Sequence, residues 1–139
     1  MPLSPEFIVS CDYIDYGCNG GSIHQVIDYL SQESIVTQKC IGYEDRKLPS
    51  CPIKCSDGSN PTYRAGCVDG SKVQAQTEEQ IKYEIYHNGP MISSMIVFDD
   101  LLGYKRGIYS YEDGEIIGSH AILLVGYGED SDGTRYWEV

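Results

Sequence analysis

The sequence predicts an α+β protein in two parts: a helical, disulfide-stapled lobe over residues 1–72 and an antiparallel sheet lobe over residues 73–139. All six cysteines lie in the first part. Apolar residues recur there at helical spacing, whereas after residue 90 they gather in short runs that suit strands. Because helices come first and strands second, separate lobes are expected rather than alternating strand and helix units.

A first short helix is predicted over about residues 5–10. Ser4 is a favourable N-cap, and Pro5 fits the first helical position because its missing N–H would be unpaired there anyway. Glu6 adds an acid near the positive end of the helix dipole.

A second helix is predicted after the turn "CNGGS". Ser22 and Gln25 have the spacing of a capping box. The apolar residues that share one face of this helix are Ile23, Val26, Ile27 and Leu30.

Residues 33–72 show no sustained hydrophobic period and contain several prolines and glycines, so they are predicted to form a loop held by disulfides.

The sheet part is expected to open with a helix. Thr77 and Gln80 form a second capping box, and the helix is predicted to stop after His87 at Asn88-Gly89-Pro90. Strands are then predicted at 91–98, 107–111, 120–128 and 134–139, with a turn at 129–133.

The cysteines favour disulfides over zinc. None belongs to a Cys-x-x-Cys pair, and no histidine lies at zinc-finger spacing from them. A loop-rich lobe of this size needs cross-links, although buried reduced thiols in a cytosolic protein are the alternative. The positions are Cys11, Cys18, Cys40, Cys51, Cys55 and Cys67.

Charge and patterning exclude several partners. The net charge of −11 opposes binding to nucleic acid or to an anionic membrane. No apolar run is long enough to span a bilayer, and no basic-then-apolar leader opens the chain. No cofactor and no metal are expected. The segment "DSDG" (130–133) lacks the further ligands of a calcium-binding EF-hand and is predicted to be a hairpin turn.

Among the three histidines, only His120 stands out. Structural roles suffice for His24 and His87 in the terminal turns of predicted helices. His120 opens a predicted buried strand, where a general base facing a cleft and a satisfied core histidine are equal alternatives. The chain offers it no nucleophile: Ser119 points to the opposite face of a strand, and no serine lies in Gly-x-Ser-x-Gly.

Six segments resemble the papain family of cysteine proteases and occur in the order found there: "LSPEFIVSCD", "GCNGGS", "IYHNGPM", "YKRGIYSY", "GSHAILLVGYG" and "DGTRYW". Within that family, "CPIKCSDGSNPTY" and "DGEIIGSHAI" are most similar to the cathepsin B group. The resemblance implies a papain-like two-lobe fold with a β-barrel-like second lobe, incomplete at both ends. It also implies that an extended peptide or protein substrate binds in a cleft between the lobes.

The resemblance also assigns roles to individual residues. His120 matches the catalytic histidine, and the disulfides Cys11–Cys51 and Cys40–Cys55 match the family's pairings. Cys18 would pair with a cysteine before residue 1, and Cys67 would be free or pair with Cys18. The residues matched to substrate binding are Asn19, Gly20 and Gly21 in the cleft wall, Ser22, Ile23, Ser94 and Ala121 around the pocket for the side chain two residues before the scissile bond, and Gly118 and Ser119 at the opposite rim.

Three family elements do not occur in the sequence: the Cys-Gly-Ser-Cys-Trp segment with the nucleophile, the oxyanion-hole glutamine and the Asn-Ser-Trp motif whose Asn orients the histidine. The usual Cys-to-His separation would place the nucleophile about 10–30 residues before residue 1. We therefore expect an internal portion of a protease, inactive by itself.

The resemblance further implies how the whole enzyme would act. Cathepsin B carries a cleft-blocking loop with paired histidines, but the ten residues between Cys40 and Cys51 contain no histidine. An open cleft, endopeptidase action and a lysosomal, vacuolar or secreted location are expected. The alternatives are a non-catalytic module that binds peptides and a disulfide-rich secreted domain unrelated to proteases.

Overall fold

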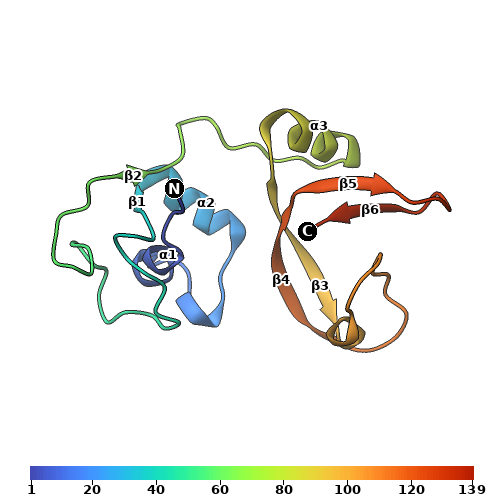
Figure 1. Ribbon diagram of the computed structural model, residues 1–139, viewed down its shortest axis with the longest axis horizontal. Coiled ribbons are helices and arrows are strands. Elements are labelled where there is room, and N and C mark those ends of the chain that lie inside the picture. Colours follow the sequence, from blue (N-terminus) through green and yellow to red (C-terminus); the bar gives the residue numbers. More distant parts are fainter. The chain divides into compact units, whose positions relative to one another are not determined.

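The computed structural model describes all residues 1–139. The chain divides into two compact units, unit 1 (Met1–Val73) and unit 2 (Gln74–Val139). Figure 1 shows the helices α1 (Pro5–Cys11) and α2 (Ile23–Gln32) in unit 1, and α3 (Glu78–Asn88) with the longer strands in unit 2.

Unit 1 contains three helices and two very short strands. The Ser4 hydroxyl caps α1 by accepting a hydrogen bond of 3.0 Å from the Phe7 N–H, as the sequence predicts. The two strands pair antiparallel inside the segment that was predicted to be a loop. The elements are α1 (Pro5–Cys11), η1 (Gly17–Asn19), α2 (Ile23–Gln32), β1 (Ile35–Val36) and β2 (Arg64–Ala65).

The predicted capping box at the start of α2 is wrong. The Ser22 side chain makes no cap hydrogen bond. Instead, the Ser22 N–H donates to Asp15 Oδ1 at 2.8 Å, so a buried carboxylate from the preceding loop fixes the helix start. The sequence predicted the helix correctly but not the group that caps it.

The core of unit 1 is closed by the two disulfides that the resemblance implies, Cys11–Cys51 and Cys40–Cys55. A long-range network adds to it: fully buried Glu6 accepts hydrogen bonds from the Ser10 hydroxyl at 2.6 Å and from the Glu44 N–H at 3.0 Å. The network and the Cys11–Cys51 disulfide join α1 to the loop that follows β1, and Cys40–Cys55 links two points within that loop. The buried core residues are Phe7, Cys11, Tyr29, Ile35, Val36, Cys40 and Ile41.

Unit 2 begins with α3 (Glu78–Asn88), whose ends are as predicted. Thr77 and Gln80 form the complete capping box, and Gly89 ends the helix with a φ of 101°. The remaining elements are β3 (Met91–Phe98), η2 (Asp99–Gly103), β4 (Ile116–Leu124), β5 (Gly126–Glu129) and β6 (Arg135–Glu138).

Two predicted strands require correction. Residues 107–111 form no strand, because the hydroxyl groups of Tyr109 and Tyr111 bond Asp100 and the Gly114 carbonyl and tie this segment into a loop. The predicted strand 120–128 is two strands, β4 and β5, interrupted at Val125.

The strands of unit 2 form two separate two-stranded sheets, β3–β4 and β5–β6, and no closed barrel. Figure 1 shows β3 and β4 running side by side. Only Leu124 is buried among the apolar residues of unit 2. The predicted buried strand at His120 is therefore wrong: β4 is exposed over most of its length.

Candidate functional site

The predicted cleft-wall residues lie in an exposed turn of unit 1. Asn19 ends η1, and Gly20 continues the chain with a φ of 104°, a conformation that favours glycine. The Tyr16 N–H donates to the Gly20 carbonyl at 3.1 Å, which fixes the turn. Asn19, Gly20 and Gly21 are all exposed.

Gly21 has two properties that suit a peptide-binding position. A Cβ at this residue would lie 2.6 Å from Asp15 Cγ, so only glycine fits against the buried carboxylate. Its own N–H and carbonyl make no hydrogen bond within residues 1–139. An exposed main-chain donor and acceptor with no partner can pair with an extended peptide in the manner of a β-strand.

Asp15 is a supporting residue that the sequence analysis missed. The residue is buried, with 8% of its surface exposed, and its carboxylate accepts a hydrogen bond from the Ser22 N–H. This contact places Ser22 and Ile23, two predicted pocket residues, directly after the turn at the start of α2. In the sequence, Asp15 is an acidic residue shortly before a glycine-rich turn. Nothing there distinguishes a buried, hydrogen-bonded carboxylate from one exposed to solvent.

In unit 2, the strand register places Ser94 directly opposite Ala121. Directly paired residues share one face of a sheet, so these two predicted pocket residues lie together. On one side along this face their neighbours are the exposed apolar pair Ile92 and Leu123, and on the other side Ile96 lies opposite the rim residue Ser119. The two small side chains thus lie between larger apolar side chains on an exposed sheet face.

His120 lies in the middle of β4, opposite Met95. His120 is exposed, and among the three histidines of the chain only His87 makes a side-chain hydrogen bond. Because successive residues alternate faces, His120 lies on the face of Met95, and Ala121 lies on the other. The structure thus brings Ser94 and Ala121 together but does not place His120 on the same face.

Gly118 and Ser119, the predicted rim, precede His120 in β4. Gly118 is paired with Val97, and a register shift follows between Val97 and Phe98, since Phe98 pairs with Ile116. A bulge of this kind increases local twist and re-aims the side chains beside it.

Two cysteines are free, and both are exposed in unit 1. Cys18 lies in η1 beside Asn19, and Cys67 follows β2. The structure thus contains no Cys18–Cys67 bond, one of the two alternatives left by the resemblance. The other four cysteines are in disulfides, so Cys18 and Cys67 are the cysteines of residues 1–139 that carry a free thiol.

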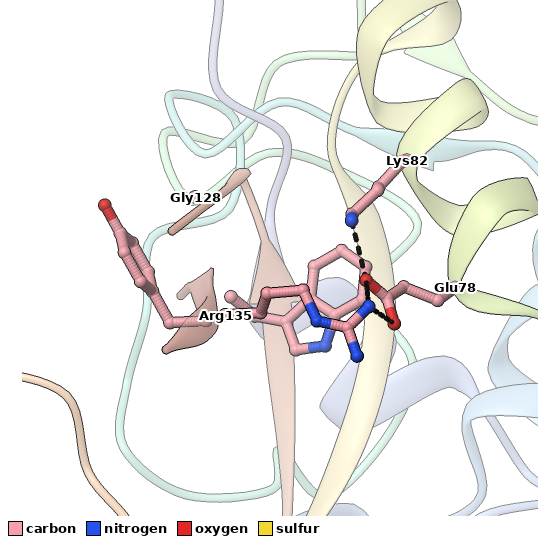
Figure 2. A pocket seen from close by; sticks show the side chains of 6 residues that line it. Glu78, Lys82, Gly128 and Arg135 are labelled. Atoms are coloured by element: carbon pink, nitrogen blue, oxygen red, sulfur yellow. Dashed lines mark hydrogen bonds and ion pairs between the residues drawn. The ribbon is translucent and has the colours of Figure 1, made fainter. Parts of the chain in front are cut away.

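A polar hollow of about 180 Å³ lies between α3 and the β5–β6 hairpin. Glu78 lines it and pairs with Lys82 at 2.6 Å and with Arg135 at 2.9 Å (Figure 2). The hydrogen bond from Lys82 and the charge of Arg135 lower the pKa of the Glu78 carboxyl. Since both cations are already paired, this hollow ties α3 to β6 and offers no free charge to a ligand.

Metal-binding side chains do not converge anywhere in residues 1–139: no group of three or more His, Cys, Asp or Glu could hold an ion. None of the helices has the length and apolar character needed to cross a membrane.

The fold of the chain is similar to that of solved cysteine proteases. The chain matches proCathepsin B S9 from Trypanosoma congolense with a TM-score of 0.79 and 30% identity, over 97% of this chain and 47% of that one. It matches the ragweed protease Amb a 11 in its proform with a TM-score of 0.73 and 25% identity, over 98% of this chain and 40% of that one.

The sequence agrees with the structural likeness. All of residues 1–139 match the papain family cysteine proteases, and the chain belongs to that family. It is 33% identical to Cathepsin B-like CP2 of Giardia intestinalis over 99% of its length, and 30% identical to Cathepsin B of Dictyostelium discoideum over 92%. The chain spans less than half of each relative, 46% in both cases. Membership confirms the resemblance and excludes a disulfide-rich domain unrelated to proteases.

Proposed function

We propose that this chain forms part of a cathepsin B-like cysteine endopeptidase, in which His120 works with a cysteine thiolate supplied from outside residues 1–139. The observation that carries the proposal is an exposed imidazole with no hydrogen-bond partner, in a chain that belongs to the papain family along its whole length. A neutral imidazole near physiological pH suits proton transfer, whereas a buried and satisfied one would not.

The proposed chemistry needs one proton carrier. His120 takes the thiol proton, and the resulting ion pair lowers the thiol pKa so that a thiolate is available at acid to neutral pH. The thiolate attacks the scissile carbonyl carbon, and His120 returns the proton to the leaving amine as an acyl-enzyme forms. Water, deprotonated by the same imidazole, then releases the acid and restores the thiolate.

Substrate binding is proposed at two surfaces. The free N–H and carbonyl of Gly21 support pairing with an extended peptide, and the small pair Ser94–Ala121 supports binding of an apolar side chain. Ser22 and Ile23 at the start of α2, and Gly118 and Ser119 in β4, are proposed as further contacts to the substrate. The substrate class is therefore a peptide or protein in extended conformation.

Endopeptidase action is proposed because the loop between Cys40 and Cys51 is short and contains no histidine, so it lacks the paired histidines of a loop that would block the substrate cleft. This loop is held against α1 by the Glu44 N–H on Glu6 and by the Leu48 N–H on Ser10 at 2.9 Å. A lysosomal, vacuolar or secreted location is proposed, because proteins bound for these places pass through the oxidising ER lumen, where the two disulfides of unit 1 can form.

The test uses the full-length product of the gene, with a fluorogenic dipeptide amide and a thiol reductant. We expect His120→Ala to lower kcat/KM by at least about a thousandfold, since removal of a catalytic base that also forms the thiolate is costly. His87→Ala is the matched control: this histidine is also exposed, and it lies at the end of α3.

The 139-residue chain itself is expected to show no turnover. Hydrolysis by this chain that an alkylating agent blocks would contradict the proposal. A full-length product that binds peptides tightly but carries Ser or Gly in place of the nucleophile would support the alternative of a non-catalytic peptide-binding module.

A further inference from the structure

The loop between η2 and β4 carries two adjacent cations, Lys105 and Arg106, at an exposed position. Residues 102–108 are all exposed, and 104–107 belong to no helix or strand. Unit 2 has four basic residues against twelve acidic ones. Because Lys82 and Arg135 are paired with Glu78, Lys105 and Arg106 are the basic side chains of this acidic unit that make no ion pair.

The main chain around this pair is held weakly. The peptide N–H groups of residues 105–108 donate no hydrogen bond within the chain. The one bond to this stretch is donated by the Tyr104 hydroxyl to the Gly107 carbonyl, and both residues are exposed. Segments with exposed main chain and few hydrogen bonds open at low free-energy cost, and such segments are the preferred sites of proteolytic cleavage.

The chain contains a second basic pair for comparison, Arg46-Lys47 in unit 1. These residues are also exposed, but their flanks are bonded: the Glu44 N–H to fully buried Glu6 and the Leu48 N–H to the Ser10 hydroxyl. The disulfide at Cys51 closes the same loop onto α1. To be cleaved, a loop must adopt an extended conformation in the active site of the protease. For the loop around Arg46-Lys47 this would break the hydrogen bonds to Glu6 and Ser10, whereas residues 104–108 make no buried hydrogen bond.

We propose that Lys105-Arg106 is a site of endoproteolytic processing, recognised by a protease whose acidic pockets bind paired basic side chains. The protease hydrolyses the Arg106–Gly107 bond. The oxygen of one water bonds to the carbonyl carbon of Arg106, the C–N bond to Gly107 breaks, and Gly107 leaves as a protonated amine.

Cleavage there converts the chain to a two-chain form without releasing the site residues. β3 and β4 remain paired at eight register positions, from Met91–Leu124 to Phe98–Ile116. Ser94 then lies on the fragment 1–106, and His120 and Ala121 lie on the fragment 107–139. This processing is independent of whether the whole protein is an active peptidase.

The test is limited proteolysis of the native, oxidised chain by an endoprotease that cleaves after Lys-Arg pairs. The variant R46K/K47R gives both loops the same Lys-Arg dipeptide, so that sequence preference cancels and only the fold differs. Peptide mass mapping then follows cleavage after residue 106 and after residue 47 over time. The variant K105Q/R106Q identifies the product of the proposed cut.

We expect cleavage after residue 106 to be at least about tenfold faster than after residue 47, with the two fragments co-eluting until denatured. After reduction and denaturation, the two sites should be cut at similar rates. Equal rates in the native chain, faster cleavage after residue 47, or resistance of both sites while the denatured chain is cut would each overturn the proposal.

Discussion

Unit 1 and unit 2 are stabilised by different kinds of interaction. Unit 1 buries a cluster of seven residues, closes it with two disulfides and adds the Glu6 network. Unit 2 has no disulfide, buries only Leu124 and leaves Ile92, Ile96 and Leu123 about half exposed on one sheet face. The comparison teaches that unit 1 is stabilised by its own interior, whereas unit 2 depends on hydrogen-bonded ladders and local side-chain contacts.

The largest expected effect on stability is that of removing the Cys11–Cys51 disulfide from unit 1. Cys11→Ser with Cys51→Ser opens a loop closed over 40 residues and should destabilise unit 1 by about 4 kcal/mol in the chain-entropy treatment. Amide hydrogen exchange read by mass spectrometry should show lost protection in residues 1–73 and none lost in 74–139. Cys18→Ser, at a free and exposed cysteine, is the control; equal effects of both variants would contradict the role of the disulfide.

The next effect concerns the buried carboxylate of unit 1. Glu6→Gln replaces one acceptor oxygen by an amide group and leaves either the Ser10 hydroxyl or the Glu44 N–H without its acceptor. A loss of about 2 kcal/mol in the free energy of unfolding is expected from denaturant titration. Glu33→Gln, on an exposed acid, should change little; if the two variants unfold alike, the network does not stabilise unit 1.

A smaller effect is expected in unit 2. A Cβ at Gly128 would lie 2.5 Å from the Tyr136 ring, so Gly128→Ala must push the ring aside at a cost of about 1–2 kcal/mol. The single tryptophan, Trp137, packs edge-on against Tyr127 in the same hairpin and reports the change by fluorescence. Gly103→Ala, at a position with open space, is the control, and an unchanged Trp137 signal in Gly128→Ala would oppose this account.

The smallest effect is a pH dependence of the loop before β4. The hydrogen bond from the Tyr109 hydroxyl to Asp100 raises the pKa of Tyr109 from 10.0 to about 12. Because the folded pKa is raised, this contribution to stability is complete below pH 10 and is lost as the pH rises toward about 12. Tyrosinate absorbance during alkaline titration should lose its latest component in Tyr109→Phe but not in Tyr104→Phe; identical titrations would refute the assignment.

Local chemistry predicted much of the fold. The Ser4 cap and the Thr77–Gln80 box depend on residues three apart, so the sequence alone specifies them. The bond from the Glu44 N–H to Glu6 spans 38 residues, and no local pattern indicates it. The strand predicted at 107–111 failed because its alternating tyrosines, Tyr109 and Tyr111, donate to Asp100 and to the Gly114 carbonyl instead of packing on a sheet.

The candidate site was predictable by a different route. Residue types alone singled out His120, and the family resemblance added the partners around it. The pairing of Ser94 with Ala121 and the unpaired main chain of Gly21 are tertiary results, because strand register and the position of Asp15 decide them. The opposite faces of His120 and Ala121, by contrast, follow from the predicted strand alone, because successive residues of a strand alternate.

The central claim is that His120 partners a thiolate, and the pH dependence of thiol alkylation in the full-length protein tests it most directly. We predict that the nucleophile reacts with an alkylating agent as a thiol whose pKa lies well below the ordinary value of about 8.5, and that His120→Ala returns the profile to about 8.5. Superimposable profiles for the parent protein and His120→Ala would contradict the claim.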